Sequence, residues 1–426
     1  MLDISMFRNN VDDIRADHDK RKIPHNNIDE VIRLDNEWRK TRFDADILRK
    51  SRNEAAKDIG KAKKSGNEVV VQEIMERVSS IGSEIDDLVL LADEYLNERD
   101  IFRMKVPNIL DHSVPVGEDD QKNTLHSFHG EKIEFDFNAK NHNEMLEENG
   151  WVDLVRAAKI SGSRFYFLKG DLARLEMALQ VYCSNFLIRR GYTLIQPPLM
   201  MNKEAYEGVT DLSDFETVMY GIEPDKYYLI ATSEHPLTAM RMDEIIEPSE
   251  LPIKLVGISQ CFRREVGAHG LSDRGIWRVH QFTKIEQVII CDPKESWKHH
   301  EELLDNAIDL WDSLGLHYRV VNICTGDMGT VASKKYDLEA WLPGANEYKE
   351  VVSCSNCTDY QANRLRMRYR TSTGNSAVHT LNSTAVATSR ALVAIMEQCQ
   401  NKKGQIIIPE VLRPLMDNQE CLESLN

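Results

Sequence analysis

Residues 67–102 carry the pattern that most constrains how this chain can fold. Steps of three and four residues connect ten positions of this segment, and all of them except Arg99 are apolar. A heptad seam sustained over several repeats predicts a long amphipathic helix that packs against another helix. The ten positions are Val71, Ile74, Val78, Ile81, Ile85, Leu88, Ala92, Tyr95, Arg99 and Phe102.

A second, weaker seam with the same spacing lies upstream of the first. It is interrupted at Asp35, Arg42 and Arg52. Gly66 and Asn67 fall between the two seams and favour a tight turn. Two helices joined by a short turn fold back on each other, so we expect an antiparallel coiled-coil hairpin. The apolar positions of the upstream seam are Ile28, Val31, Trp38, Ala45, Leu48, Ala55, Ile59 and Ala62.

The two arms of the predicted hairpin carry opposite charge. Residues 20–64 hold 14 Lys and Arg against 8 Asp and Glu, whereas residues 67–102 hold 2 against 10. Opposite charges beside an apolar seam steer two helices together, which explains the pattern without any partner. A basic helix also suits the phosphate backbone of a nucleic acid. Spacing alone favours the first explanation, and a plain coiled-coil dimer or scaffold stays open.

Length and composition indicate two domains in a cytoplasmic protein. The chain has 426 residues, 42% of them hydrophobic, and a formal net charge of −16. We expect an N-terminal domain at 1–106, a linker rich in turn-forming residues at 107–130, and a globular body at 131–426. The acidic balance excludes a wholly basic nucleic-acid binder. The N-terminus lacks a signal-peptide layout, no apolar run is long enough to span a membrane, and the 8 scattered cysteines suit a reducing cytosol.

The body mixes helices with short strands that come in runs. Helical spacing covers residues 171–190 and 294–314. Strands in runs, with few helices between them, predict an α+β fold whose largely antiparallel sheet is flanked by helices, rather than a doubly wound parallel sheet. The strand-like segments are YYLIAT, IKLVGIS, EQVIIC, YRVVNIC and YKEVVSC.

Several common signatures of functional sites do not occur in this sequence. It contains no G-x-x-x-x-G-K-[ST] phosphate loop and no G-x-G-x-x-G fingerprint. It also lacks the H-E-x-x-H and G-x-S-x-G motifs of common hydrolases. Cys354 and Cys357 form a lone C-x-x-C pair, which favours packed thiols over a zinc site because no second pair stands at metal spacing.

Arginines, carboxylates and small hydroxyl groups gather at the ends of several expected strands. Residues 260–287 hold four arginines and two glutamates beside Phe282. Arginine matches phosphate and carboxylate oxygens in two-point contacts, and carboxylates hold Mg²⁺ or an ammonium group. The residues therefore predict an anion site with acidic helpers. They are Arg263, Arg264, Glu265, Arg274, Arg278 and Glu286, together with Thr232, Ser233, Glu234, Glu350, Ser353 and Arg390.

At these residues the chain resembles the class II seryl-tRNA synthetases over nearly its whole length. GYTLIQPPLM resembles the first motif of the class, CFRRE with RVHQF the second, and LNSTAVATSR the third. TSEHPLT, HQFTKIEQ and VSCSNCTDYQANR are similar to segments of the seryl-type enzymes. The third motif lacks the glycine-rich form of many class members, and Ser233 stands where bacterial relatives often carry alanine.

The resemblance implies a six- or seven-stranded antiparallel sheet and the ATP-dependent, AMP-forming ligation of L-serine to tRNA(Ser). Arg263 and Arg390 would be catalytic, and Glu350 and Ser353 would coordinate Mg²⁺. No zinc is expected. The implied ATP-binding residues are Arg263, Arg264, Glu265, Arg278, Val279, Phe282, Glu350, Val351, Val352, Ser353 and Arg390. The implied serine-binding residues are Thr232, Ser233, Glu234, Arg263, Glu286, Asn382 and Thr384.

The resemblance also implies how such a chain assembles and meets RNA. Residues 1–106 would form a tRNA-binding domain, and a homodimer would be built partly around Pro198. The same family commonly charges tRNA(Sec). Two alternatives are a synthetase-like ligase that loads a carrier protein and a non-catalytic synthetase-like regulator. The arm residues expected to contact tRNA are Arg42, Arg49, Lys50, Arg52 and Lys57.

Overall fold

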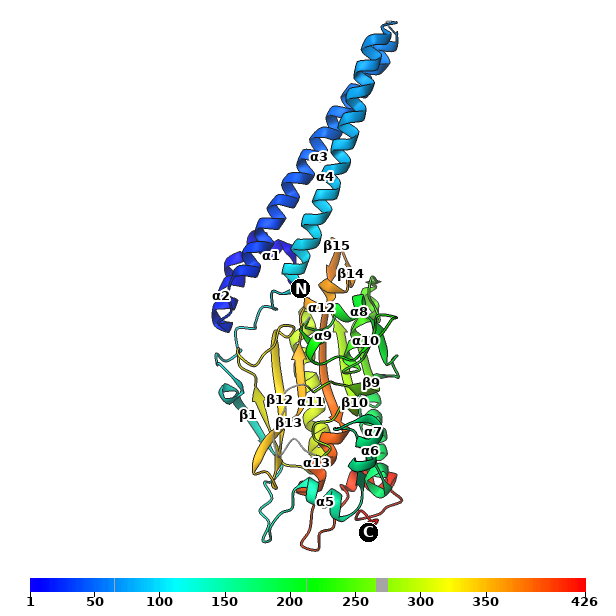
Figure 1. Cartoon of the computed structure of the whole chain (residues 1–426). Helices are drawn as coiled ribbons and strands as arrows, with labels where there is room; N and C mark the ends of the chain where they lie inside the picture. The colour runs from blue at the N-terminus through cyan, green and yellow to red at the C-terminus, as the bar shows by residue number, and fades with distance from the viewer. Residues whose placement is uncertain (65, 212, 266–274) are drawn as a thin grey trace. The chain divides into compact units, whose positions relative to one another are not determined.

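The computed structural model of the chain describes residues 1–64, 66–211, 213–265 and 275–426. They form two compact units, Leu2–Pro107 and Asn108–Asn426, the second of which also includes Met1 (Figure 1). In this described part of the chain, none of the helices combines the length and the apolar character that crossing a bilayer requires.

The first unit is a helical hairpin. Its two long helices, α3 and α4, run side by side over 39 and 37 residues (Figure 1). Asn67 caps α4 by accepting a hydrogen bond from the Val70 amide, and Gly66 has a φ of +71°, which only glycine adopts without strain. The predicted coiled-coil hairpin is therefore confirmed. The helices are α1 (Ile4–Asn9), α2 (Val11–Arg21), α3 (Asn26–Lys64) and α4 (Glu68–Met104).

Two charged residues that break the apolar seams meet each other in the hairpin. Arg99 Nη1 donates to Asp35 Oδ1 at 2.8 Å, and Arg8 Nε donates to Asp35 Oδ2 at 2.7 Å. Burial alone would raise the pKa of Asp35, but the hydrogen bonds from Arg8 and Arg99 outweigh it and hold the pKa below its usual value. The seam of α4 therefore continues through Arg99 as an ion pair.

The second unit is built on a sheet of eight strands within the described residues. Neighbouring strands are antiparallel except β4, which pairs parallel with β9. This confirms an α+β fold with a largely antiparallel sheet, although the sheet has eight strands where six or seven were expected. In spatial order the strands are β1 (Thr124–His129), β11 (Tyr318–Asn322), β12 (Lys334–Leu342), β13 (Glu347–Asn356), β16 (His379–Ala387), β10 (Gln281–Cys291), β9 (Ile253–Phe262) and β4 (Thr193–Ile195).

The additional strand comes from the predicted linker at 107–130. Strand β1 pairs with β11, and Leu110 and Val114 are buried against Val321 and Ile323. Residues 108–130 therefore belong to the second compact unit, and Pro107 ends the first. The sequence hides this strand because β1 lies at an edge of the sheet and is largely exposed, so it lacks an apolar face.

Helices cover one face of the sheet, and the opposite face carries the polar residues. Trp311 of α11 donates to the Ala385 carbonyl of β16, and α7 and α13 join the same apolar core. The central strand β10 is buried along both faces, so its polar side chains point into a covered space. The helices of this unit are α5 (His142–Glu148), α6 (Leu154–Ser161), α7 (Gly170–Ile188), α8 (Lys203–Glu207), α9 (Asp214–Thr217), α10 (Glu234–Ala239), α11 (Ser296–Ser313), α12 (Tyr360–Arg364) and α13 (Thr388–Gln398).

Short strands complete the second unit in three small sheets. Strand β14 pairs with β15 and β8, β7 pairs with β5 and β6, and β2 pairs with β3. The residues of these strands are β2 (Val152–Asp153), β3 (Phe167–Leu168), β5 (Met200–Asn202), β6 (Gly221–Ile222), β7 (Tyr227–Leu229), β8 (Ile245–Ile246), β14 (Arg368–Thr371) and β15 (Gly374–Ala377).

Candidate active site

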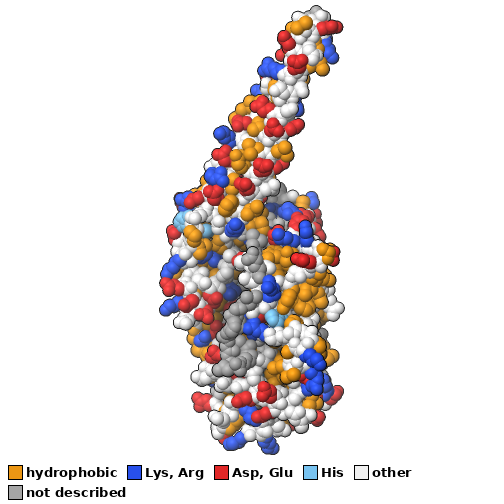
Figure 2. All heavy atoms as spheres, in the orientation of Figure 1, with side chains coloured by type: hydrophobic (Ala, Val, Ile, Leu, Met, Phe, Trp, Pro, Cys, Tyr) orange, Lys and Arg blue, Asp and Glu red, His pale blue; other side chains and the backbone are white. Residues whose placement is uncertain are grey.

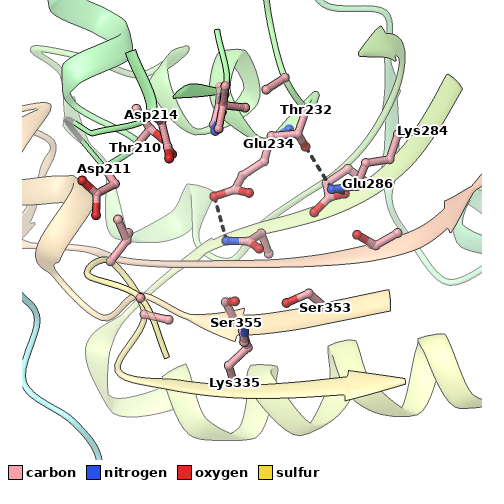
Figure 3. A pocket seen from close by; sticks show the side chains of 18 of the residues that line it. Thr210, Asp211, Asp214, Thr232, Glu234, Lys284, Glu286, Lys335, Ser353 and Ser355 are labelled. Atoms are coloured by element: carbon pink, nitrogen blue, oxygen red, sulfur yellow. Dashed lines mark hydrogen bonds and ion pairs between the residues drawn. The ribbon is translucent and has the colours of Figure 1, made fainter. Parts of the chain in front are cut away.

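A cavity of about 450 Å³ opens on the polar face of the central strands (Figure 3). Its walls come from β10, β12, β13 and β16, from α9, α10 and α13, and from residues 209–211, 218, 231–232, 263 and 328–332. Eleven of the predicted active-site residues line it. They are Thr232, Glu234, Arg263, Phe282, Glu286, Glu350, Val351, Ser353, Asn382, Thr384 and Arg390.

One end of the cavity is acidic and holds a buried lysine. Glu286 lies between Gly257 of β9 and Thr384 of β16 in the strand pairing. Lys284, two residues away on the same strand, places its Nζ 2.6 Å from Glu286 Oε2 and donates to Thr232 Oγ1 at 3.2 Å (Figure 3). This arrangement gives the acidic end a fixed geometry without any ligand.

Glu234 completes the acidic end from the first turn of α10. Its Oε1 accepts hydrogen bonds from Asn382 Nδ2 at 3.0 Å and from Gln361 Nε2 at 3.3 Å. Burial, followed by the charge of Glu286, raises the pKa of Glu234 to about 7. Burial also raises the pKa of Glu286, against the opposing charge of Lys284. Two buried carboxylates at one end of a cavity form an attractive site for an ammonium group.

Gly257 explains how α10 comes so close to the sheet. A Cβ at this position would stand 2.9 Å from the side chain of Ser233, so a larger residue would push the helix away. Ser233 Oγ donates to the Gly257 carbonyl at 3.3 Å and does not line the cavity. The start of α10 turns the Ser233 side chain back onto β9, so a contact between Ser233 and serine stays a prediction.

Arg263 lies between the acidic end and an aromatic wall. Its guanidinium carbon is 5.3 Å from the centre of the Phe282 ring, and its Nε donates to the Ala231 carbonyl at 3.3 Å. Its charge lowers the pKa of Glu234, of Glu286 and of Glu350, although burial is the larger influence on each. Arg263 therefore acts electrostatically on both ends of the cavity.

The other end of the cavity is rich in cations. Arg390 Nη1 donates to the Glu350 carbonyl at 2.8 Å and lies 3.5 Å from the carboxylate Oε1 of the same residue. Burial would raise the pKa of Glu350, but Arg390 and Lys335 outweigh it and lower that pKa. Glu350, Lys335 and Arg390 also line an adjoining cavity of about 360 Å³, together with Arg278. Six acidic and four basic residues line this adjoining cavity, so it carries charges of both signs.

Four of the predicted ATP-binding residues line neither cavity in the described part of the chain. Glu265 accepts a hydrogen bond from Arg278 Nη1 at 3.1 Å. The Arg264 amide donates to the Val218 carbonyl, and the side chains of Val279 and Val352 pack in the apolar core. For these valines a contact through the backbone remains a prediction. Arg274 lies outside the described residues.

Oxygen donors suited to Mg²⁺ stand at the cationic end. Glu350 and Ser353 both line the first cavity, and carboxylate and hydroxyl oxygens are ligands that this hard cation accepts. Among the described residues, no group of three or more His, Cys, Asp or Glu is arranged to hold a metal. A cation at Glu350 and Ser353 would therefore need further oxygens from phosphate or water.

The sequence prediction missed four charged residues of the cavity: Lys284, Lys335, Asp211 and Asp214 (Figure 3). Strand alternation could have indicated Lys284, because residues two apart on a strand share a face with each other. Lys335 reaches the cavity because it lies opposite Ser355 in the strand pairing, which no local pattern reveals.

The predicted arm residues lie on α3, and Pro198 lies before β5. Arg42, Lys50 and Lys57 are exposed, and Arg52 is half-buried. Arg49 donates to Asp46 at 2.6 Å. Acidic and basic side chains are interleaved along the hairpin in Figure 2, so the basic charge of α3 is not an isolated patch.

Comparisons with known proteins agree along the whole chain. Residues 1–110 match the family described as "Seryl-tRNA synthetase N-terminal domain", and residues 218–399 match "tRNA synthetase class II core domain (G, H, P, S and T)". The chain is 51% identical to the serine–tRNA ligase of Methanocella arvoryzae, over 99% of this chain and 100% of that protein.

Solved structures give the same result. The seryl-tRNA synthetase from Pyrococcus horikoshii complexed with ATP matches with a TM-score of 0.95 and 41% identity, over 100% of both chains. The cytoplasmic serine–tRNA ligase from Naegleria fowleri in complex with AMP matches with a TM-score of 0.90 and 35% identity, over 100% of this chain and 99% of that one.

Proposed function

The chain belongs to the seryl-tRNA synthetase family of class II aminoacyl-tRNA synthetases, and from this premise we propose that it is a serine–tRNA ligase. It joins L-serine to ATP as seryl-adenylate, releasing pyrophosphate, and then transfers the seryl group to the 3′ end of tRNA(Ser). The observation that carries the proposal is one cavity in which Arg263 separates an acidic end from a cationic end.

Arg263 promotes the first step by bringing two anions together. The serine carboxylate attacks the α-phosphorus of ATP, and the bond from that phosphorus to the leaving pyrophosphate breaks. A guanidinium between carboxylate and phosphate lowers their repulsion and fixes their approach. Arg390 and Arg278 hold the outer phosphates, and Phe282 stacks on adenine. No protein nucleophile is needed, because the substrate supplies its own.

The acidic end selects serine by hydrogen bonds. Glu234 and Thr232 hold the ammonium group, Glu286 accepts from the hydroxyl group, and Asn382 and Thr384 close the pocket. A pocket built for a hydroxyl rejects an analogue without one by a factor on the order of 10⁴, since its buried polar groups lose their partner.

Glu350 and Ser353 would hold Mg²⁺, with its further oxygen ligands coming from phosphate or water. The cation screens the charge of the phosphates when it is bound. The lowered pKa of Glu350 supports this assignment, because it keeps the carboxylate ionised. Charges of both signs around the phosphates then balance.

The helical arm binds the tRNA, and the enzyme acts as a homodimer in the cytoplasm. The exposed cations on α3 suit a phosphate backbone. Pro198 is followed by two exposed apolar residues, Leu199 and Met200, and α7 exposes Met177; in Figure 2 apolar side chains gather in the region where Figure 1 labels α8 and α10. Such a patch suits a second copy of the chain. Charging of tRNA(Sec) with serine is part of the same proposal.

Exchange of labelled pyrophosphate into ATP, followed by charging of tRNA transcripts, tests the proposed function. Serine should support exchange, whereas alanine, threonine and glycine should fall behind by factors on the order of 10² or more. A tRNA(Ser) transcript should accept the serine, and a carrier protein should not. If none of the amino acids supports exchange, the chain would instead be a non-catalytic regulator. Serine transfer to a carrier protein would indicate the carrier ligase.

A further inference from the structure

Lys284 is the buried cation of the acidic end. Its side chain is 9% exposed and that of Glu286 is 1% exposed, with 2.6 Å between Nζ and Oε2. The same ammonium donates to Thr232 Oγ1 at 3.2 Å. Lys284 therefore contacts Glu286 on its own strand, β10, and Thr232, which lies two residues before α10. These contacts lie across the floor of the cavity.

The carboxyl groups in direct contact at this end outnumber its ammonium group. Glu234 and Glu286 bring two carboxylates, and Lys284 brings one ammonium group. Burial raises the pKa of both carboxyl groups, the mutual repulsion adds to this for Glu234, and Lys284 opposes it in both. One carboxylate is thus left for the ammonium group of an amino acid, while the other stays with the lysine.

The remaining titratable groups around this cluster do not replace Lys284. Burial, with Lys284 and Arg263, lowers the pKa of His235 to about 3, so this histidine is neutral. Burial raises the pKa of Cys261 and of Cys357, so both stay as thiols. Arg263 and Glu350 also line the cavity, and the charge of Arg263 lowers the pKa of Glu234 and of Glu286. Among the described residues lining the cavity, Lys284 is the cation in direct contact with Glu286.

We propose that Lys284 is a specificity-determining positioning residue, whose ammonium group fixes the Glu286 carboxylate as the acceptor for the hydroxyl of a small amino acid. This inference rests on the proposed function. With Lys284 in place, Glu234 serves the substrate ammonium and Glu286 serves the hydroxyl. Without it, the pKa of both carboxyl groups rises further, and a neutral Glu286 accepts a hydrogen bond more weakly.

The test measures pyrophosphate exchange by the full chain with Lys284→Met, across pH 6 to 9. At pH 7 the KM for serine should rise about 100-fold while the KM for ATP stays within about twofold, because the loss concerns one buried ion pair at the serine end. The preference for serine over alanine should fall at least tenfold. Raising the pH should bring the KM of the variant for serine closer to that of the unaltered chain, since both carboxyl groups then ionise without the lysine.

Two further variants separate charge from shape. Lys284→Ala should regain serine activation when butylammonium is added, and Lys284→Arg should keep most of it without the added pH dependence. Retained ATP binding reports that each variant is folded. The matched control is Lys254→Met, which removes a lysine paired with Glu302 at 2.6 Å on β9, outside the cavity, and should leave both KM values unchanged.

An unchanged KM for serine in Lys284→Met would overturn the inference. A raised KM for serine that is relieved neither by higher pH in Lys284→Met nor by butylammonium in Lys284→Ala would also overturn it. This includes the case in which ATP binding is lost as well. These outcomes differ from a failure of the proposed function, in which the unaltered chain itself shows no serine-dependent exchange.

Discussion

Glu234 and Glu286 reach the same end of the cavity from different elements, α10 and β10. Their residue types and their motifs suggested a polar pocket, but their partner Lys284 was not predicted. Alternation places Lys284 beside Glu286, yet only the assembled sheet shows that this face is covered. The resemblance implied that Ser233 contacts serine; this stays a prediction, since its Oγ donates to the Gly257 carbonyl at the turn into α10.

Replacing Glu286 by alanine tests the residue scale. The kcat/KM for serine in pyrophosphate exchange should fall by about 10³-fold or more, because the hydroxyl group loses its acceptor and Lys284 loses its counter-ion. ATP binding should survive, since Phe282 and Arg390 are untouched. Glu302→Ala, which removes a partly exposed carboxylate outside the cavity, is the control. Unchanged serine-dependent exchange in Glu286→Ala would remove the assignment.

The long hairpin shows what can be read at the scale of elements. Heptad spacing was enough to predict α3, α4 and the turn between them, because the signal is local and repeated. The same spacing marked Asp35 and Arg99 as interruptions of the seams. Their ion pair was not predicted, because it spans 64 residues and depends on the register of the two helices. Strand β1 was missed for a related reason: an exposed edge strand carries no apolar alternation.

Arg99→Ala should loosen the hairpin. Asp35 would keep only Arg8, and breaking a buried pair costs about 3 kcal/mol. Amide hydrogen exchange of α3 and α4 in the full chain measures this as a lower free energy of opening. Arg33→Ala removes an exposed pair with Glu30, which solvent screens, and should cost much less. Equal effects of the two substitutions would contradict the structural role of Asp35.

The same ion pair gives the hairpin a dependence on pH. The pKa of Asp35 is lower in the folded chain than in the unfolded chain, so its contribution is present above about pH 4, the unfolded value. It is lost as the pH falls through the lower folded pKa. Hydrogen exchange of α3 between pH 5 and pH 2 should therefore show a smaller acid-dependent loss in Arg99→Ala than in the unaltered chain. An identical pH profile would argue against Asp35 as the acid-sensitive group.

At the scale of the whole molecule, the class of fold was predictable and the cavity was not. Runs of strands indicated an antiparallel sheet, but the spatial order places β16 between β13 and β10, which are far apart in sequence. This crossing brings Glu350, Asn382 and Glu286 to one cavity. Long-range strand pairing of this kind has no local sequence pattern. The residues that share the cavity could therefore be predicted from the resemblance of the motifs but not from periodicity.

Deleting residues 20–102 separates the two units. Serine-dependent pyrophosphate exchange should persist, because the cavity is formed by residues of the second unit, and charging of tRNA(Ser) should be abolished. In the full chain, replacing Arg42, Lys50 and Lys57 by glutamine should weaken tRNA binding and flatten its salt dependence by about 0.7–0.9 per lost phosphate contact.

Replacing the exposed acids Glu73, Glu76 and Glu84 by glutamine is the matched control on α4. It should not weaken tRNA binding. Normal charging by the truncated chain would show that the arm is only a structural accessory.

A crystal structure of the chain with a non-hydrolysable seryl-adenylate analogue tests the central claim most directly. The serine hydroxyl should lie within hydrogen-bond distance of Glu286, adenine should stack on Phe282, and Arg263 should contact the linkage between them. An analogue bound in the cavity beside His142 and Glu397, or with its adenine at Glu286, would contradict the account.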